Sequence, residues 1–270
     1  MQLSPVILIT GASSGIGEAT ARLFANKGYH AILAARRVER INQIATEINQ
    51  SGGQALAIAT DITRISDIED LVSTSIAKFG RIDILVNNAG LGRLDWLENL
   101  DPIDDIESQI QTNLLGLIEM TRAVVPYMIA RKRGHIINIG SLSGLIGTPT
   151  YSVYAASKFG IRGFSEALRR ELHIWGIYVS VVYPGSVSNE FASKAGIHRK
   201  TGLSTPSRLK LTSEQVAQCI WGVVNRPRRM VILPRMMRVA VWLNYYFPAI
   251  VDWAIEKRFV KPERLMMIIK

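Results

Sequence analysis

The chain has few residues that could form disulfides or hold a metal. Its 270 residues include one cysteine and four histidines. The single cysteine, Cys219, excludes an internal disulfide and is typical of a protein from a reducing compartment. The histidines, His30, His135, His173 and His198, lack the close spacing of metal ligands, so we expect no metal site.

Long hydrophobic runs are also lacking. The longest uncharged stretch near the C-terminus is VAVWLNYYFPAIV, 13 residues at 239–251, and Pro248 interrupts it. A helix needs roughly 20 apolar residues to cross a bilayer, so this stretch is too short. The N-terminus has no basic segment ahead of its apolar VILI run. We therefore expect no signal peptide and a cytoplasmic protein.

Acidic residues are scarce in the C-terminal part of the chain. Residues 191–270 hold 15 Lys/Arg against 4 Asp/Glu, a balance of +11, whereas residues 1–190 hold 17 and 18, a balance of −1. The formal net charge of +10 therefore belongs to the last part of the sequence. We expect no nucleic-acid partner, because no base-reading module accompanies this charge.

What the chain does have is a regular alternation of apolar, β-branched runs with amphipathic segments. Hydrophobic residues make up 48%, enough for one large core. Strands are predicted at residues 6–9, 29–35, 54–59, 83–87, 135–140, 177–183 and 230–233. Helices are predicted near residues 15–27, 38–50, 67–78, 105–131, 152–174 and 213–225. Continuously apolar strands between helices indicate an α/β fold with a Rossmann-type, doubly wound parallel sheet.

A glycine-rich turn, TGASSGIG, follows the first predicted strand at residues 10–17. Its glycines permit a tight turn and a close approach of the backbone to a ligand. The helix that begins here offers free N–H groups to a pyrophosphate. In this position the turn predicts dinucleotide binding by Gly11, Ser13, Ser14, Gly15, Ile16 and Gly17.

The second predicted strand ends in AARR, where an NAD-selective site usually places an acid for the adenosine ribose. Arg36 and Arg37 instead offer guanidinium groups, which can pair with a 2′-phosphate through two hydrogen bonds. A difference of roughly 2–4 kcal/mol between the cofactors would give a preference of about 30- to 1000-fold. We predict NADP(H), against the alternative that both arginines only begin a solvated helix.

The stretch YSVYAASK, residues 151–158, places Tyr154 and Lys158 just over one helical turn apart, on the same face. Such a pair is common in helices and means little by itself. A tyrosine titrates near 10, and a neighbouring ammonium favours the phenolate. The pair is therefore suited to proton exchange, provided that other residues support it.

Several further segments support it, because together they resemble the classical short-chain dehydrogenases/reductases. The resemblance covers about residues 5–190. The matching segments are TGASSGIG, Asp61 in ATDIT, NNAG at 87–90, Asn113, Ser141, Tyr154-xxx-Lys158 and PG at 184–185. The resemblance implies an NADP-dependent carbonyl reductase or alcohol dehydrogenase.

The resemblance also implies roles for single residues. Ser141 would hydrogen-bond the substrate carbonyl oxygen, Tyr154 would exchange a proton with it, and Asn113 would interrupt a helix to anchor a water. Lys158 would hold the nicotinamide ribose and lower the pKa of Tyr154. Asn189 stands where the family commonly has threonine in PG-x-V-x-T. Further cofactor contacts are implied at Asp61, Ile62, Asn88, Ala89, Gly90, Pro184, Gly185 and Val187.

Apolar residues near the predicted site favour a hydrophobic substrate, a bulky ketone or aldehyde rather than a sugar. Residues 186–210 would form a flap over the pocket, and its walls would include Leu142, Tyr151 and Trp96. Two alternatives stay open: a non-catalytic NADP(H)-binding sensor or scaffold, and a reductase of 3-oxoacyl thioesters carried by an acyl carrier protein.

The C-terminal residues 235–270 break the alternation and predict one or two amphipathic helices, appended to a catalytic domain of residues 1–234. Three explanations fit this basic extension. It could lie on an anionic membrane surface, dock an acidic partner such as an acyl carrier protein, or pack on a neighbouring subunit or the protein's own core. Because the family usually assembles through its long central helices, the resemblance implies a homodimer or homotetramer.

Overall fold

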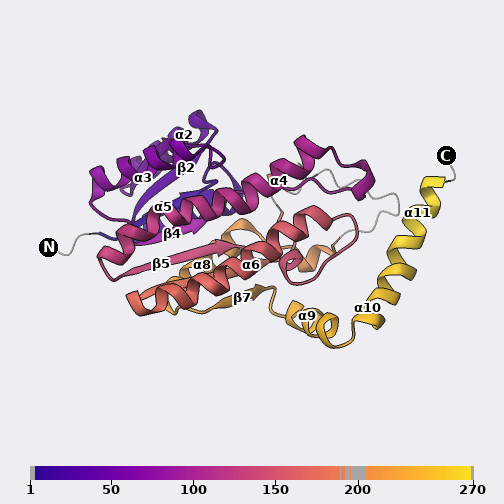
Figure 1. Ribbon diagram of the computed structural model, residues 1–270. Coiled ribbons are helices and arrows are strands. Elements are labelled where there is room, and N and C mark those ends of the chain that lie inside the picture. The colour runs from indigo at the N-terminus through magenta and orange to yellow at the C-terminus, as the bar shows by residue number, and fades with distance from the viewer. Residues whose placement is uncertain (1–3, 189, 192–194, 196–204, 269–270) are drawn as a thin grey trace.

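The structure, a computed structural model, describes residues 4–188, 190–191, 195 and 205–268, and it confirms the predicted fold class (Figure 1). Within these residues, seven parallel strands form one sheet in the order β3-β2-β1-β4-β5-β6-β7. Each predicted strand is present, with ends shifted by at most one residue. The strands are β1 (Val6–Thr10), β2 (His30–Ala35), β3 (Gln54–Ala59), β4 (Ile84–Asn87), β5 (Gly134–Ile139), β6 (Ile177–Pro184) and β7 (Met230–Leu233).

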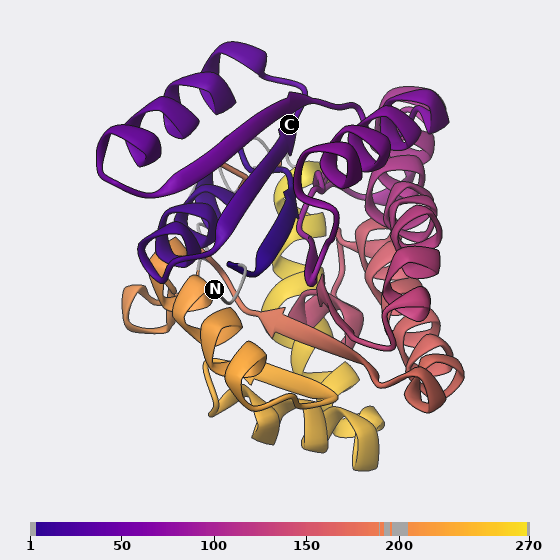
Figure 2. The ribbon, with the colours of Figure 1, turned by 90° about the vertical axis from the view of Figure 1, so that its left-hand side faces the viewer.

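Helices cover both faces of the sheet (Figure 2). One face carries α1 (Gly15–Asn26), α2 (Val38–Gln50) and α8 (Ser213–Asn225). The other carries α3 (Ile65–Phe79), α5 (Gly116–Ala130) and α6 (Ser152–Leu172). Side chains such as Phe24, Ile44 and Ile220 are fully buried against the first face. Each such burial stabilises the fold by roughly 1.5–3 kcal/mol before the entropy cost of folding.

Local sequence signals explain where these helices begin and end. At the start of α8, the Thr212 hydroxyl accepts from the backbone N–H of Gln215 at 3.3 Å. The Gln215 side chain in turn accepts from the backbone N–H of Thr212 at 2.9 Å. This reciprocal pair satisfies two N–H groups that a helix start leaves without partners. At the C-terminal end of α3, the cap residue is Gly80, whose φ of +69° is a conformation that glycine adopts readily.

The predicted helix at residues 105–131 is interrupted. It consists of a π-helical segment η2 (Pro102–Glu107), a short α4 (Ser108–Ile110), a second π-helical segment η3 (Gln111–Leu115), and α5. A π-helical turn inserts an extra residue and re-aims the side chains around it. Asn113 lies in η3, as expected for a residue that interrupts a helix. Short 3₁₀ segments occur at η1 (Leu97–Asn99), η4 (Leu142–Gly144), η5 (His173–Trp175) and η6 (Ser207–Leu209).

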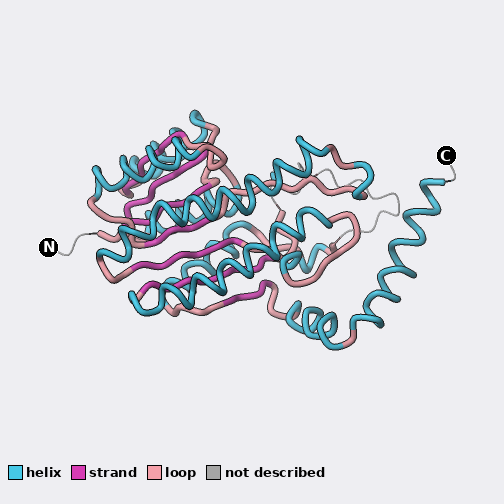
Figure 3. The backbone as a smooth tube through the Cα atoms, in the orientation of Figure 1, coloured by secondary structure: helices cyan, strands magenta, loops and turns pink. Residues whose placement is uncertain are grey.

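The chain after β7 forms the predicted helical extension, beyond the edge of the sheet (Figure 3). After α9 (Met237–Tyr246), the segments α10 (Pro248–Ile255), η7 (Glu256–Val260) and α11 (Lys261–Ile268) follow without a break. Met237 and Val241 of α9 pack on a core cluster that contains Tyr183 and Ile232. One side of α9 is therefore part of the hydrophobic core.

The strand order places two loops side by side at the carboxyl edge of the sheet. From β1 the chain goes outward to β2 and β3, and it then returns to β4 on the other side of β1. The loops that follow β1 and β4 therefore leave in opposite directions. Such a divergence opens a crevice where open α/β sheets bind ligands. The glycine-rich turn and the NNAG segment lie at this point.

At the opposite edge, Asp83 ties three segments together just before β4. Its carboxylate accepts from the backbone N–H of Val6 at 2.8 Å, from Arg81 at 2.7 and 2.6 Å, and from Arg131 at 3.1 Å. Burial alone would raise the pKa of Asp83, but these hydrogen bonds and positive charges hold it below its usual value. The ionised carboxylate thus stabilises the start of β1 and the end of α5.

We expect Asp83→Asn to lower the free energy of unfolding by about 2 kcal/mol at neutral pH, since an amide loses charged hydrogen bonds to two arginines. The folded pKa is depressed, so the contribution is present above the unfolded pKa of about 3.9 and is lost as the pH falls through the folded value. Urea unfolding at several pH values measures this. Asp70→Asn, at an exposed site, is the control. A stability difference that does not narrow in acid would contradict the assignment.

Candidate active site

Thr10 joins the glycine-rich turn to the segment after β4. Its hydroxyl accepts from the backbone N–H groups of Asn88 at 3.0 Å and Ala89 at 3.1 Å. The Asn88 amide donates back to the carbonyls of Thr10 at 3.0 Å and Gly11 at 3.2 Å. Gly11 has a φ of +66°, and a Cβ there would lie 2.7 Å from the Cα of Ala89. Asn88, predicted as a cofactor contact, thus uses its amide to hold the turn.

The start of α1 is arranged as an anion site. Ser14 is its N-cap residue, yet the Ser14 side chain makes no capping bond within the described turn and instead accepts from Arg37 at 2.7 Å. The first-turn N–H groups of Gly15, Ile16 and Gly17 are thereby left for a ligand. A cavity of about 360 Å³ adjoins this helix start and is lined in part by Ser14 and Glu190.

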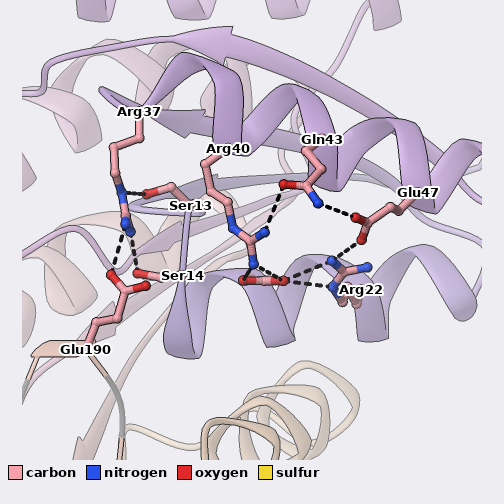
Figure 4. Close-up of polar contacts among 9 residues, drawn as sticks. Ser13, Ser14, Arg22, Arg37, Arg40, Gln43, Glu47 and Glu190 are labelled. Atoms are coloured by element: carbon pink, nitrogen blue, oxygen red, sulfur yellow. Dashed lines mark hydrogen bonds and ion pairs between the residues drawn. The ribbon is translucent and has the colours of Figure 1, made fainter.

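Arg36 and Arg37, both predicted to bind a 2′-phosphate, have different partners in the structure. Arg37 donates to the Ser13 hydroxyl at 3.2 Å as well as to Ser14, and it forms an ion pair with Glu190 at 2.9 Å (Figure 4). Arg36 lies 3.8 Å from Asp61, and its side chain is 68% exposed. Only Arg37 of the two is therefore bonded to the glycine-rich turn.

Asp61 and Ile62, implied as cofactor contacts, lie after β3. The Asp61 carboxylate accepts from the backbone N–H and the hydroxyl of Thr63 at 3.0 and 2.8 Å. Burial would raise the pKa of Asp61, but these bonds and nearby arginines lower it. Ile62 is buried, and its carbonyl oxygen lies 2.7 Å from the place where a Cβ on Gly116 would be. Both residues are thus fixed by the start of α5 and their own loop.

Asn113 is completely buried and holds the segment after β4 from the other side. Its Oδ1 accepts from the backbone N–H of Leu91 at 2.8 Å, and its Nδ2 donates to the Leu91 carbonyl at 2.8 Å. The same Nδ2 lies 3.2 Å from the Ser157 hydroxyl on α6. A Cβ on Gly90 would meet Asn113 at 3.1 Å and the Lys158 ammonium at 3.7 Å. Asn113, Gly90 and Lys158 therefore meet at one point.

Tyr154 and Lys158 lie on α6, and Ser141 follows β5. Ser141 lies close enough to Tyr154 to lower the pKa of its phenol, and the Ser141 hydroxyl accepts from the backbone N–H of Ser143 at 3.1 Å. The Lys158 ammonium donates to the carbonyl of Ile139 at 3.1 Å and lies 5.6 Å from the centre of the Tyr154 ring. The structure thus brings together Ser141, Tyr154, Lys158 and Asn113, as the sequence predicted.

With protein groups alone, burial raises the pKa of Tyr154 to about 12, although nearby Ser141 lowers it. Burial likewise lowers the pKa of Lys158 to about 8, so the ammonium is present below that pH. In both residues desolvation opposes the charged form. The predicted lowering of the Tyr154 pKa combines Lys158 with the positive nicotinamide of the oxidised cofactor, and it stays a prediction.

Phe191, which was not predicted as a site residue, packs against Tyr154. The Phe191 ring lies 5.8 Å from the Tyr154 ring, and it contacts the position where Gly92 would carry a Cβ. The backbone N–H of Leu94 donates to the carbonyl of Ala195 at 2.9 Å. Phe191 belongs to the stretch predicted as a flap. Its one signal in the sequence was an aromatic residue among small and polar neighbours.

The three predicted pocket residues lie in different surroundings. The Tyr151 ring is 6.3 Å from the Tyr154 ring. Leu142 lies 3.2 Å from where Gly185 would carry a Cβ. Trp96 instead contacts the C-terminal extension, with Phe259 stacked 6.3 Å away and the Arg264 guanidinium 3.6 Å above its ring. Trp96 therefore joins the loop after β4 to the last helices.

The segment after β6, with the implied cofactor contacts Pro184, Gly185 and Val187, is held by β7 and the residues that flank it. Pro184 ends β6, and the Gly185 N–H donates to the Leu233 carbonyl at 2.7 Å. Val187 forms a bridge with Leu211. Asn189, the departure from the family pattern, lies outside the described residues.

The described part of the chain has neither a cluster of metal ligands nor a membrane-spanning helix. There, no three His, Cys, Asp or Glu side chains come together as a metal site, and the absence of a metal stays a prediction. Among the same residues, no helix combines the length and apolar character that crossing a bilayer requires.

Comparisons with known proteins agree with this geometry. The family model for short chain dehydrogenases matches residues 5–200. The NADP-dependent 3-hydroxy acid dehydrogenase YdfG of Salmonella typhi is 38% identical over 225 residues, 82% of this chain and 90% of the relative. The 11-beta-hydroxysteroid dehydrogenase-like 4A of Arabidopsis thaliana is 35% identical over 247 residues, 90% of this chain and 81% of the relative. The closed form of serine dehydrogenase complexed with NADP+ is 35% identical with a TM-score of 0.76, covering 84% of this chain and 94% of that structure.

We expect Asn113→Asp to lower the free energy of unfolding by roughly 2–3 kcal/mol, because a carboxylate cannot donate to the Leu91 carbonyl and would be buried beside it. Urea unfolding near neutral pH measures the loss. Asn26→Asp makes the same chemical change at an exposed site and should stay within about 0.5 kcal/mol of the wild type. Equal stability of the two variants would refute the role given to Asn113.

Proposed function

The chain belongs to the short-chain dehydrogenase family, and we propose that it is an NADP(H)-dependent oxidoreductase that interconverts a carbonyl and an alcohol, with Tyr154 as the general acid and base. One observation carries the proposal. Tyr154 lies near Ser141 and has the Lys158 ammonium 5.6 Å from its ring centre, at the carboxyl edge of the sheet and beside the glycine-rich crevice. These groups surround a place where a reacting oxygen can meet two hydroxyl donors.

The residues present fit the cofactor on structural grounds. The close approach of Gly11 to Ala89 and of Gly17 to Gly11 leaves no room for side chains at the turn, while the first N–H groups of α1 face outward for a pyrophosphate. Arg37 stands beside Ser13 and Ser14, where a guanidinium can pair with a 2′-phosphate. NADPH supplies the hydride when it is bound. The similarity to NADP-dependent relatives supports the same cofactor here.

The protein's groups act on the substrate oxygen. Carbonyl reduction places negative charge on that oxygen, and the hydroxyls of Ser141 and Tyr154 can stabilise it by hydrogen bonds. With a pKa of about 12, Tyr154 holds its proton at neutral pH and is ready to donate it. The reverse reaction needs the phenolate, which the Lys158 ammonium favours below about pH 8. Lys158 also lies where it could hold a ribose hydroxyl beside Gly90.

A mainly hydrophobic substrate is supported by the surroundings of Tyr154. Leu94, Tyr151, Phe191 and Ala195 form an apolar cluster with it. A bulky apolar ketone or its alcohol would meet ring and aliphatic surface there, whereas a sugar would leave its hydroxyls without partners. The relatives' names suggest 3-hydroxy acids and hydroxysteroids as compounds to test first.

Tyr154→Phe should lower kcat for carbonyl reduction by about 10²- to 10⁴-fold, because phenylalanine has no proton to give. NADPH oxidation is followed at 340 nm with apolar ketones, aldehydes, 3-oxo acids, steroids and 3-oxoacyl thioesters. Tyr151→Phe, three residues upstream, is the matched control and should change kcat by only a few-fold. Full turnover by Tyr154→Phe would refute the mechanism. NADPH binding by the wild type without turnover of any compound would favour a sensor instead.

Arg37→Ala should reduce the preference for NADPH over NADH, as a ratio of kcat/KM, by about 30-fold or more. Arg36→Ala is the matched control, and because this side chain is 68% exposed we expect less than about a threefold change. Glu190→Gln should lower KM for NADPH, since the amide no longer competes as a charged partner for Arg37. Equal effects of the two arginine variants would contradict this assignment.

A further inference from the structure

The C-terminal extension carries an uncovered aromatic surface that the proposed reaction does not use. Nine large hydrophobic residues of α9, α10 and the residues that flank α9 are at least 41% exposed, and the family model ends before them, at residue 200. They form what we name the aromatic corner: Met236, Val239, Trp242, Leu243, Tyr245, Tyr246, Phe247, Ile250 and Trp253. Monomeric soluble proteins rarely expose so contiguous an apolar surface without a partner.

The aromatic corner is a packed surface and not a set of isolated side chains. The Trp242 ring lies 5.2 Å from Tyr246 and 5.6 Å from Phe247, and Tyr245 lies 4.9 Å from Tyr246. The opposite side of α9 is already buried, since Met237 and Val241 pack on the core. The packing of α9 on its own domain therefore leaves the aromatic corner facing outward.

The extension is also fixed in place at its far end. Phe259 stacks on Trp96, the Arg264 guanidinium lies 3.6 Å from the centre of the same ring, and Arg264 forms an ion pair with Glu98. One side of α9 packs on the core, and η7 and α11 contact the loop after β4. The extension therefore cannot fold over the aromatic corner without breaking these contacts.

Basic side chains border the exposed tryptophans. Lys257 lies 5.1 Å above the Trp253 ring, four residues away along the helix. Arg238 stands four residues before Trp242, on the same side of α9, and Arg235 and Arg258 are exposed nearby. The acidic residues of this stretch are Asp252 and Glu256, and Glu256 is paired with Lys261 at 2.9 Å. Tryptophan and tyrosine beside Lys and Arg are typical of helices that lie in a membrane interface.

We propose that the aromatic corner binds the surface of an anionic lipid bilayer, with α9 and α10 lying in the interface and not crossing it. The charge decides between this partner and a second copy of the chain. A symmetric dimer would bring two copies of the same net-basic surface together, which costs binding energy, whereas anionic headgroups complement that surface. The aromatic side chains would sit at headgroup level, with their apolar rings in the acyl boundary.

The test uses the full chain and sucrose-loaded vesicles, either of phosphatidylcholine alone or with about 30 mol% phosphatidylglycerol. We expect co-sedimentation with the anionic vesicles at least about tenfold stronger than with the neutral ones, and weaker at high salt. Ile250→Ser/Trp253→Ser should lower the partition coefficient by about tenfold or more, because it removes two anchors that are 63% and 61% exposed. Arg235→Glu/Arg238→Glu should remove most of the dependence on anionic lipid.

The matched control is Ile174→Ser/Trp175→Ser, an exposed isoleucine and tryptophan after α6, which should bind vesicles like the wild type. Unchanged melting temperatures show that each variant is folded. No binding of the wild type to anionic vesicles, or an equal loss in the control, would overturn the proposal. A smaller particle mass of the Ile250→Ser/Trp253→Ser variant by light scattering, without lipid, would assign the corner to a contact between subunits. None of these readouts depends on turnover or on NADPH.

Discussion

Two hydrogen bonds between the Asn113 carboxamide and the backbone of Leu91 hold the candidate active site in shape. They can form because a π-helical turn aims Asn113 into the protein, and its amide also reaches Ser157 on α6. The loop after β4, the interrupted helix and the helix that carries Tyr154 and Lys158 are thereby fixed to one another. An amide suits this position because it offers one acceptor and one donor group in the same plane. Hydrogen bonds of this kind are costly to leave unmade in a buried site.

Burial in the same region sets the chemistry of the catalytic pair. Removing water raises the pKa of Tyr154 from 10.0 to about 12 and lowers that of Lys158 from 10.5 to about 8, so two values that usually lie close together move apart. Each change opposes the charged form of the group concerned. A pKa of about 12 keeps Tyr154 protonated, as carbonyl reduction requires, whereas alcohol oxidation requires the phenolate and therefore additional positive charge near the ring. The pKa of Tyr154 therefore depends in part on the charge of the ligand that binds beside it.

The sequence predicted the strands well because a strand buried on both faces is an uninterrupted apolar run. Ser141, Tyr154 and Lys158 were found by spacing and resemblance, and they do lie together. The Arg37–Glu190 ion pair and the contact of Phe191 with Tyr154 were not found, since the first joins positions 153 residues apart and neither leaves a local period. The increase of the Tyr154 pKa by burial was not predicted, for a related reason. A sequence reveals a neighbouring cation, but only the fold reveals how much water is excluded.

The C-terminal extension shows why composition alone could not assign a surface. α9 is apolar on two sides: Met237 and Val241 enter the core, while Val239 and Trp242 face outward. An amphipathic helix usually has one apolar face, which is buried, but α9 has apolar residues both on its core side and on its exposed side. The stack of Phe259 and Arg264 on Trp96 then fixes the following helices to the loop after β4, within the same loop that Asn113 holds at Leu91. The aromatic corner is therefore fixed relative to the catalytic crevice. A partner that binds the corner determines how the crevice is oriented toward it.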